Sequence, residues 1–101
     1  MEKLLKFSIV IPCYNTEKTV LETLTSVSKQ NYKNWEAVIV NDGSPDNVEA
    51  LVLDFIKNDK RFKYFKKENG GLASARNFGI ENSTGDFILP LDSDNKVKPE
   101  F

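Results

Sequence analysis

The sequence contains no histidine and only one cysteine, Cys13. A lone cysteine excludes a disulfide within the chain and is natural for a protein of a reducing compartment. Zinc sites built from cysteine and histidine, and catalysis by a histidine general base, are excluded within these residues. Because no histidine is available to activate it, we expect Cys13 to be a small buried residue rather than a nucleophile.

The chain also lacks an excess of positive charge and any long apolar stretch. Its formal net charge is −1, which argues against a nucleic-acid partner or a broad contact with anionic lipid. The lysines between Lys57 and Lys67 are interrupted by acidic residues and asparagines, as is typical of a solvated face. No run reaches transmembrane length, and the N-terminus does not look like a signal peptide. We expect a cytoplasmic protein, with any membrane attachment peripheral and supplied by a longer full-length chain.

Hydrophobic patterning predicts four strands and three helices within one domain, residues 1–101. The strands are predicted over residues 7–11, 35–40, 61–67 and 87–91, and the helices over 17–29, 45–56 and 72–82. Asn15 or Thr16 is the expected cap of the first helix, and Ser44 followed by Pro45 the expected start of the second. The third strand, rich in lysine, is expected at an edge of the sheet. The fourth is a short apolar run and is expected to be buried on both faces.

The order β-α-β-α-β-α-β predicts a three-layer α/β/α, Rossmann-like fold with a mostly parallel sheet. Ligands of such folds bind beyond the carboxyl ends of the strands. Each predicted strand end carries polar or glycine residues: Tyr14, Asp42, Gly70-Gly71, and the pair Asp92 and Asp94. The chain has neither the dinucleotide-binding glycine pattern nor a Walker loop, so another device must hold any phosphates.

Asp92 and Asp94 lie one residue apart directly after the fourth strand. Two carboxylates this close repel each other, and a hard divalent cation that carries phosphate oxygens would neutralise them. The cluster Asp-Ser-Asp-Asn is also typical of a turn or of a helix cap, and both alternatives stay open.

The other strand-end residues each allow two interpretations. Tyr14 would stack on a planar ring or pack over its own loop. Asp42-Gly43 would face a ligand or form a simple turn. Gly70-Gly71 would permit close approach of a ligand or form a tight turn. Arg76 would bond a base or phosphate, or make a surface salt bridge.

Four segments together resemble the N-terminal half of the family-2 glycosyltransferases of the GT-A fold. They are Phe7-Ser-Ile-Val-Ile-Pro-Cys-Tyr-Asn15, Val40-Asn-Asp-Gly-Ser44, Asn69-Gly-Gly-Leu-Ala-Ser-Ala-Arg-Asn77 and Leu91-Asp-Ser-Asp94. They occur in the family's order and span almost the whole chain. The resemblance implies a site for a nucleoside-diphosphate sugar, with a uridine diphosphate sugar as the expected donor. Its nucleotide-binding residues would be Pro12, Tyr14, Asp42, Gly71, Arg76 and Asp92.

The resemblance also implies a metal-dependent, inverting transfer. Asp94, with Asp92, would hold Mg²⁺ or Mn²⁺ bridging the diphosphate, and a carboxylate base would activate the hydroxyl of a saccharide or lipid-linked acceptor, as in polysaccharide biosynthesis. In the family that base lies well beyond the metal motif, so we expect it beyond Phe101. We therefore expect this chain to be the donor-binding half of a longer enzyme, inactive alone and prone to self-association.

The sequence leaves two alternatives open. Phosphotransferases of the haloacid dehalogenase type also place Asp-x-Asp after a strand, but there the motif normally opens the fold and here three β-α units precede it. The second alternative is a nucleotide-binding module that has lost catalysis.

Overall fold

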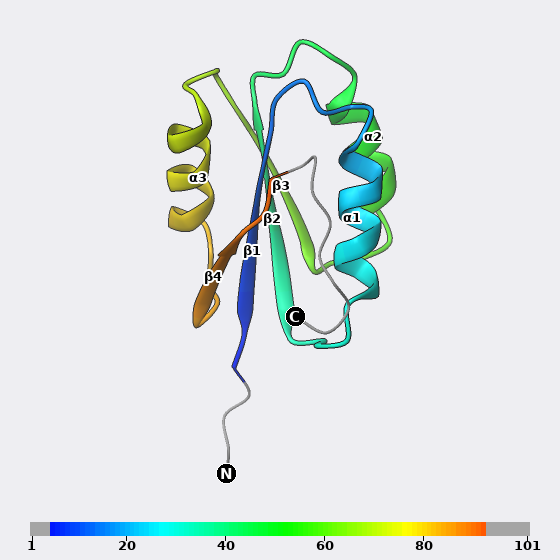
Figure 1. Cartoon of the computed structure of the whole chain (residues 1–101), viewed down its shortest axis with the longest axis vertical. Helices are drawn as coiled ribbons and strands as arrows, with labels where there is room; N and C mark the ends of the chain where they lie inside the picture. The colour runs from blue at the N-terminus through cyan, green and yellow to red at the C-terminus, as the bar shows by residue number, and fades with distance from the viewer. Residues whose placement is uncertain (1–4, 93–101) are drawn as a thin grey trace.

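The computed structural model describes residues 5–92 of the chain. Its elements alternate along the sequence (Figure 1): β1 (Phe7–Cys13), α1 (Val20–Lys29), β2 (Trp35–Asp42), α2 (Val48–Ile56), β3 (Phe62–Lys67), α3 (Leu72–Glu81) and β4 (Phe87–Pro90). The strands form one sheet in the order β3-β2-β1-β4, and each neighbouring pair is parallel. The predicted α/β fold and the edge position of the third strand are confirmed.

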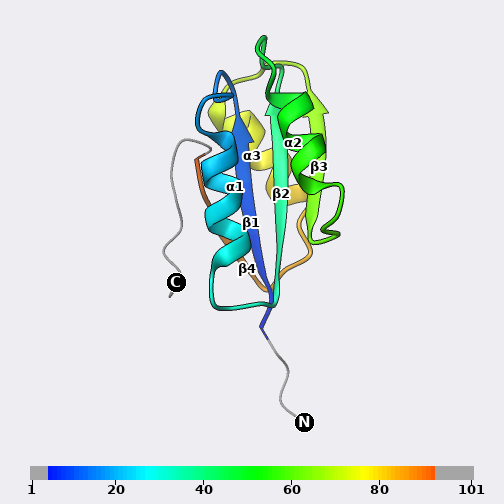
Figure 2. The same cartoon turned by 90° about the vertical axis from the view of Figure 1, so that its right-hand side faces the viewer.

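Helices cover both faces of the sheet. α1 and α2 lie on one face and α3 on the other, which gives the predicted three layers (Figures 1 and 2). Because all four strands run in the same direction, their carboxyl ends gather at one edge. Among residues 5–92, no helix has the length and apolar character needed to cross a membrane.

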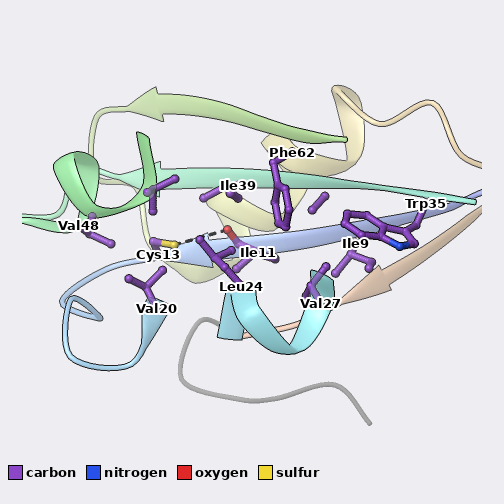
Figure 3. Packing of buried hydrophobic residues seen from close by; sticks show 12 residues of the cluster. Ile9, Ile11, Cys13, Val20, Leu24, Val27, Trp35, Ile39, Val48 and Phe62 are labelled. Carbon is purple, nitrogen blue, oxygen red and sulfur yellow. Dashed lines mark hydrogen bonds between the residues drawn. The ribbon is translucent and has the colours of Figure 1, made fainter. Parts of the chain in front are cut away.

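The central strands supply most of the core. Every residue of β2 is buried, as are six of the seven in β1. Between the sheet and α1 and α2, Ile9, Ile11 and Ile39 pack against Leu24 and their neighbours (Figure 3). Cys13 lies in the same cluster and is buried, which confirms its predicted role as a small core residue.

α3 lies unusually close to the opposite face of the sheet. A Cβ at Gly79 would come within 2.4 Å of Val10 Cγ1, and real Cβ atoms do not approach other atoms so closely. The helix also buries Ala75 against Val38 and Val40. Small residues on this side of α3 therefore let the helix backbone approach the strands.

The prediction that the fourth strand is buried on both faces is wrong. β4 pairs only with β1 among the described residues, and Phe87 and Ile88 are 49% and 39% exposed. An apolar run indicates that a strand is buried in its complete structural context, but it does not show which other segment covers the strand. Here the described residues place no strand on its outer edge.

Both long helices of the α1/α2 layer begin three residues later than predicted. Near α1, the carbonyl of Thr16 accepts hydrogen bonds from Thr19 N and Val20 N, so residues 17–19 form a turn and the helix starts at Val20. Before α2, Ser44 does not cap the helix: its hydroxyl bonds a neighbouring loop and Asp46, and the helix starts at Val48.

β1 and β2 run two residues further than predicted and so include Pro12 and Asp42. Pro12 is tolerated in a central strand because its nitrogen, which has no hydrogen to donate, faces a side of β1 where no strand residue lies opposite it. Val10 directs its carbonyl to the β4 side, where Leu91 N bonds it at 2.9 Å. Pro12, two residues on, faces the same side, past Pro90, the last residue of β4.

A buried carboxylate, Glu36 of β2, joins four segments at the amino edge of the sheet. It accepts hydrogen bonds from Ser8 Oγ, Lys63 Nζ and Thr84 N, each at 2.6 Å. Burial alone would raise the pKa of Glu36, but these donors and the nearby Lys6 outweigh it and lower the pKa from 4.5 to about 2. Ionised Glu36 therefore ties the segment that links α3 to β4 onto the sheet.

Because the folded pKa of Glu36 lies below its unfolded value, its stabilisation is complete above about pH 4.5 and is lost as the pH falls toward 2. We expect Glu36→Gln to lower the free energy of unfolding at pH 7 by about 3 kcal/mol. The deficit should shrink as the pH falls from 4.5 to 3. Urea unfolding of both proteins across this range measures it. Glu81→Gln, at the exposed end of α3, is the matched control and should follow the wild type. A deficit that is the same at pH 3 and pH 7 would contradict this role for Glu36.

Candidate functional site

A pocket of about 170 Å³ opens at the carboxyl edge of the sheet. It lies where the loops after β1 and β2, the first turn of α3 and the end of β4 meet. Its lining residues are Pro12, Cys13, Tyr14, Thr16, Asp42, Leu72 and Asp92. Four residues predicted as ligand-binding from three different strand ends are thus brought together in one pocket. Thr16 and Leu72 were not predicted as site residues.

The pocket has flat apolar surfaces beside polar ones. Tyr14 is 47% exposed and Leu72 is 51% exposed, although both line the pocket. A tyrosine and a leucine left half in water at the mouth of a pocket are available to a planar ligand group. Tyr14 is followed by Asn15 in the left-handed backbone region (φ 57°), which turns the chain away from β1 just after the pocket.

The loop that carries Tyr14 is fastened to the loop after β2. Asn15 N donates to Ser44 Oγ at 2.9 Å, and Glu17 N donates to Asp46 Oδ2 at 3.1 Å. The other oxygen of Asp46 accepts from Ser44 Oγ and from Val48 N, the first amide of α2. Burial opposes ionisation, but these donors hold the pKa of Asp46 below its usual value. One ionised side chain therefore fixes both loops and the start of α2.

A second group, at the end of β2, fixes the same loop. Asn41 Oδ1 accepts from Ser44 N at 2.9 Å, and Asn41 Nδ2 donates to the phenol oxygen of Tyr64 at 2.9 Å. That phenol donates to Glu49 Oε2 at 2.8 Å, and burial with this carboxylate raises the pKa of Tyr64 to about 12. Tyr64 thus remains a hydrogen-bond donor at any physiological pH.

Asp42, the last residue of β2, is almost fully buried and holds the loop between β3 and α3. Its Oδ1 accepts from Lys67 Nζ at 2.9 Å and from Gly70 N at 3.0 Å. Its Oδ2 accepts from Gly71 N at 3.0 Å and from Asn69 Nδ2 at 3.3 Å. Asn69 Nδ2 also donates to the main-chain oxygen of Asp42 at 3.0 Å. Burial would raise the pKa of Asp42, but Lys67 and the two glycine amides outweigh it and lower the pKa.

Glycines make this contact between loops feasible. A Cβ at Gly43 would lie 2.7 Å from Asn69 N, and one at Gly70 would lie 2.9 Å from Lys67 Nζ. Gly71, predicted as nucleotide-binding, has φ 94°, immediately precedes α3 and gives its amide to Asp42. A positive φ of this size favours glycine, because a side chain would be strained there.

Arg76 and Asp92 form an ion pair at the rim, with Arg76 Nη2 3.0 Å from Asp92 Oδ1. Both side chains are 40% exposed, so the pair itself adds little stability. Arg76 Nε is buried and has no hydrogen-bond partner among the described residues. One nitrogen of the guanidinium, Nη2, is thus engaged by Asp92, and the side chain as a whole stays 40% exposed.

Asp94, the other predicted metal ligand, lies outside the described residues. Within residues 5–92, no cluster of three or more histidine, cysteine, aspartate or glutamate side chains is arranged to hold a metal ion. Asp92 supplies one carboxylate of the kind that Mg²⁺ and Mn²⁺ prefer, and its ion pair with Arg76 uses Oδ1.

The prediction that the lysines up to Lys67 form a solvated face is wrong at Lys67. The side chain of Lys67 is only 17% exposed and bonds Asp42, whereas that of Lys63 bonds Glu36 and is 40% exposed. Sequence reasoning also missed Asp46 and Asn69. The run Asn-Asp-Gly-Ser-Pro-Asp contained the signal for Asp46, because a second acidic residue so close to Asp42 needs donors of its own.

Comparison with known proteins identifies relatives across nearly the whole chain. Residues 8–101 match the model of the glycosyl transferase family 2. A protein of Rickettsia bellii named as an uncharacterized glycosyltransferase is 44% identical over 90 residues, which cover 89% of this chain and 13% of the relative. The chain thus spans about an eighth of the length of that relative.

Solved structures show the same fold. S. aureus TarS 1–349, in complex with UDP-GlcNAc, superposes with a TM-score of 0.86 at 33% identity, over 94% of this chain and 28% of that one. The mannosyltransferase PcManGT from Pyrobaculum calidifontis, in complex with GDP-Man and Mn²⁺, gives a TM-score of 0.82 over 89% of this chain and 28% of that one. At 23% identity the second likeness concerns the fold alone.

The loop contacts of Asp46 predict a measurable effect on stability. Asp46→Ala removes the acceptor for Glu17 N and Val48 N, so we expect the free energy of unfolding to fall by about 1–3 kcal/mol. Asp54→Ala, on the exposed face of α2, is the matched control and should change it by less than about 0.5 kcal/mol. Chemical unfolding at pH 7 measures both. Equal, small effects of the two substitutions would show that Asp46 does not join the loops.

Proposed function

This chain belongs to glycosyl transferase family 2, and on that basis we propose that it forms the donor-binding part of an enzyme that transfers a sugar from a nucleoside diphosphate to an acceptor hydroxyl. The observation that carries the proposal is the pocket at the carboxyl edge of the sheet. Its lining includes Tyr14, Asp42 and Asp92, which come from three of the four family-like segments. S. aureus TarS, 33% identical, was solved with UDP-GlcNAc and with UDP, which supports a uridine nucleotide as the donor.

The side chains of the pocket suit the parts of such a donor. Tyr14 and Pro12 offer flat apolar surface to a base. Asp42 would accept a hydrogen bond from an N–H on the edge of the base. Arg76, partly exposed beside Asp92, would help to fix the nucleotide. Gly71 orders the first turn of α3 against Asp42 and so keeps the pocket open on that side.

We also propose a divalent cation, Mg²⁺ or Mn²⁺, held by Asp94 together with Asp92. The chemistry of Asp92 fits: it is a partly exposed carboxylate at the pocket with only one oxygen in its ion pair. A bound cation would neutralise charge on the departing diphosphate. Arg76 would keep Asp92 oriented through the existing ion pair, and its charge adds to the positive potential there.

The proposed reaction inverts the anomeric carbon and needs a carboxylate base for the acceptor hydroxyl. The buried carboxylates of the described residues already accept hydrogen bonds from within the protein, so they are poor candidates for this base. Glu36, Asp42 and Asp46 accept several internal hydrogen bonds each. We therefore place the base and the acceptor site outside these residues and expect the chain to bind donor without transferring sugar.

Membership of this family removes the basis for the haloacid dehalogenase alternative. A module that binds nucleotide without catalysis remains a competing proposal, and nucleotide binding without transfer by a full-length protein would favour it. The predicted cytoplasmic location stays a prediction.

Calorimetric titration of the chain with UDP, with and without Mn²⁺, tests the proposal. We expect binding that strengthens with Mn²⁺, and we expect Asp94→Ala to remove this metal dependence because a carboxylate ligand is lost. Asp54→Ala, far along α2, is the control and should bind as the wild type. Titrations with GDP and dTDP establish the preferred base. Failure of the folded wild type to bind any of the three diphosphates would refute a donor site in this chain.

We further propose that the chain self-associates through β4. Its outer edge has no partner strand among the described residues, and Phe87 and Ile88 expose apolar surface there. Ile88→Lys should shift light scattering toward the monomer mass, because a charge on this edge opposes pairing. Leu53→Lys, equally exposed on α2, should leave the mass unchanged. A monomeric wild type at about 0.5 mM, far above the concentration at which a specific dimer forms, would contradict the proposal.

A further inference from the structure

The carboxylate of Asp42 has no free hydrogen-bonding capacity of its own. Two carboxylate oxygens offer about four lone-pair directions. Four donors already use them: Lys67 Nζ and Gly70 N on Oδ1, and Gly71 N and Asn69 Nδ2 on Oδ2. A ligand that bonds Asp42 must therefore replace one of these donors.

The geometry shows which donor is replaced at least cost. The two glycine amides are main-chain groups fixed by the start of α3. The Asn69 bond to Oδ2 is the longest of the four at 3.3 Å, and the same amide keeps its 3.0 Å bond to the main-chain oxygen of Asp42 if the longer one is lost. Lys67 makes a charge-assisted bond of 2.9 Å and is also held by the carbonyl of Glu68 at 2.7 Å. Exchange at Oδ2 against Asn69 is the easier event, and Lys67 stays in place.

We propose that Lys67 is a specificity-determining residue of the donor site: by staying paired with Asp42 it keeps this carboxylate ionised and its Oδ2 available as an acceptor. This inference rests on the proposed function. An ionised carboxylate accepts hydrogen bonds and donates none. The site should therefore prefer nucleoside diphosphates whose base presents a ring N–H, such as uracil, over cytosine, whose corresponding ring nitrogen is unprotonated.

No other cation of the described residues takes the place of Lys67. Besides Asp42, the ionisable groups that line the pocket are Asp92, which pairs with Arg76, the phenol of Tyr14 and the buried thiol of Cys13. Asp42 forms its ion pair with Lys67. Without Lys67, burial would oppose ionisation of Asp42 with only amide donors against it, and the pKa of Asp42 would rise.

The test is the pH profile of UDP and CDP binding by Lys67→Met, from pH 8 to pH 5 in the presence of Mn²⁺. The wild type should prefer UDP throughout this range. In Lys67→Met the UDP affinity, relative to wild type at the same pH, should fall as the pH decreases, by up to about tenfold for each unit below the new pKa of Asp42. The preference for UDP over CDP should shrink in parallel, because a protonated carboxyl donates to cytosine. The phosphates of the nucleotide also titrate in this range, but they do so equally for both proteins. The ratio of variant to wild-type affinity at each pH therefore removes their contribution.

Two lysine variants serve as controls. Lys67→Arg keeps the positive charge and should restore the wild-type pH profile. Lys66→Met removes the adjacent lysine of β3, which pairs instead with Glu49 at 3.5 Å, and should also leave the profile unchanged. A loss of affinity caused only by a loosened loop would be the same at every pH.

The possible results separate the two proposals. A folded Lys67→Met protein whose ratio to wild type is independent of pH, with an unchanged UDP preference, overturns the role of Lys67 and leaves the donor site standing. A wild type that binds neither nucleotide overturns the donor site and this inference with it. If Lys67→Met does not fold, Asp42→Asn tests the same charge at pH 7, where an undiminished UDP preference would overturn the inference.

Discussion

Carboxylates taken out of water must be met by donors, and β2 carries one near each end. Glu36 is buried at the amino edge of the sheet and Asp42 at the carboxyl edge. Their donors come largely from the two segments that flank α3: the amides of Gly70 and Gly71 before the helix, and the amide of Thr84 after it. The position of α3 along the sheet is thus set at both ends by charges on one strand. Its approach to the sheet is set by Gly79, which allows near contact with Val10.

This constraint explains why a pocket exists at the carboxyl edge. α3 contributes Leu72 to the lining and Arg76 to the rim, so fixing its first turn fixes that wall. The opposite wall, which carries Tyr14, is held by Asp46 through the loop after β2. Both walls are therefore held in place by hydrogen bonds to β2 and to the residues that follow it. This strand thus fixes the positions of the groups that would meet a nucleotide.

Much of the fold and several pocket residues were predictable from sequence because they depend on local pattern. The apolar runs predicted the strands, and their alternation with helices predicted the parallel sheet. The residues at the strand ends included Pro12, Tyr14, Asp42 and Asp92, which meet in one pocket. What failed depends on partners distant in sequence. Ser44 looked like a helix cap, but its hydroxyl serves a loop 29 residues away. Lys67 looked like one more solvated lysine, and only the fold brings it to Asp42, 25 residues earlier. The exposure of β4 depends on which strand lies beyond it, which an apolar run does not encode.

The strand order has a consequence for how the chain acquires its structure. β1 is made first, yet one of its two neighbours is β4, and Phe7 pairs with Phe87. During synthesis the edge of β1 that will pair with β4 stays unpaired until some eighty further residues have been made. β2 and β3 can already pair on the other side of β1. Pairings so distant in sequence slow folding and prolong the exposure of an open strand edge. The longer this edge of β1 stays open, the longer a nascent chain of this design can associate with other chains through it.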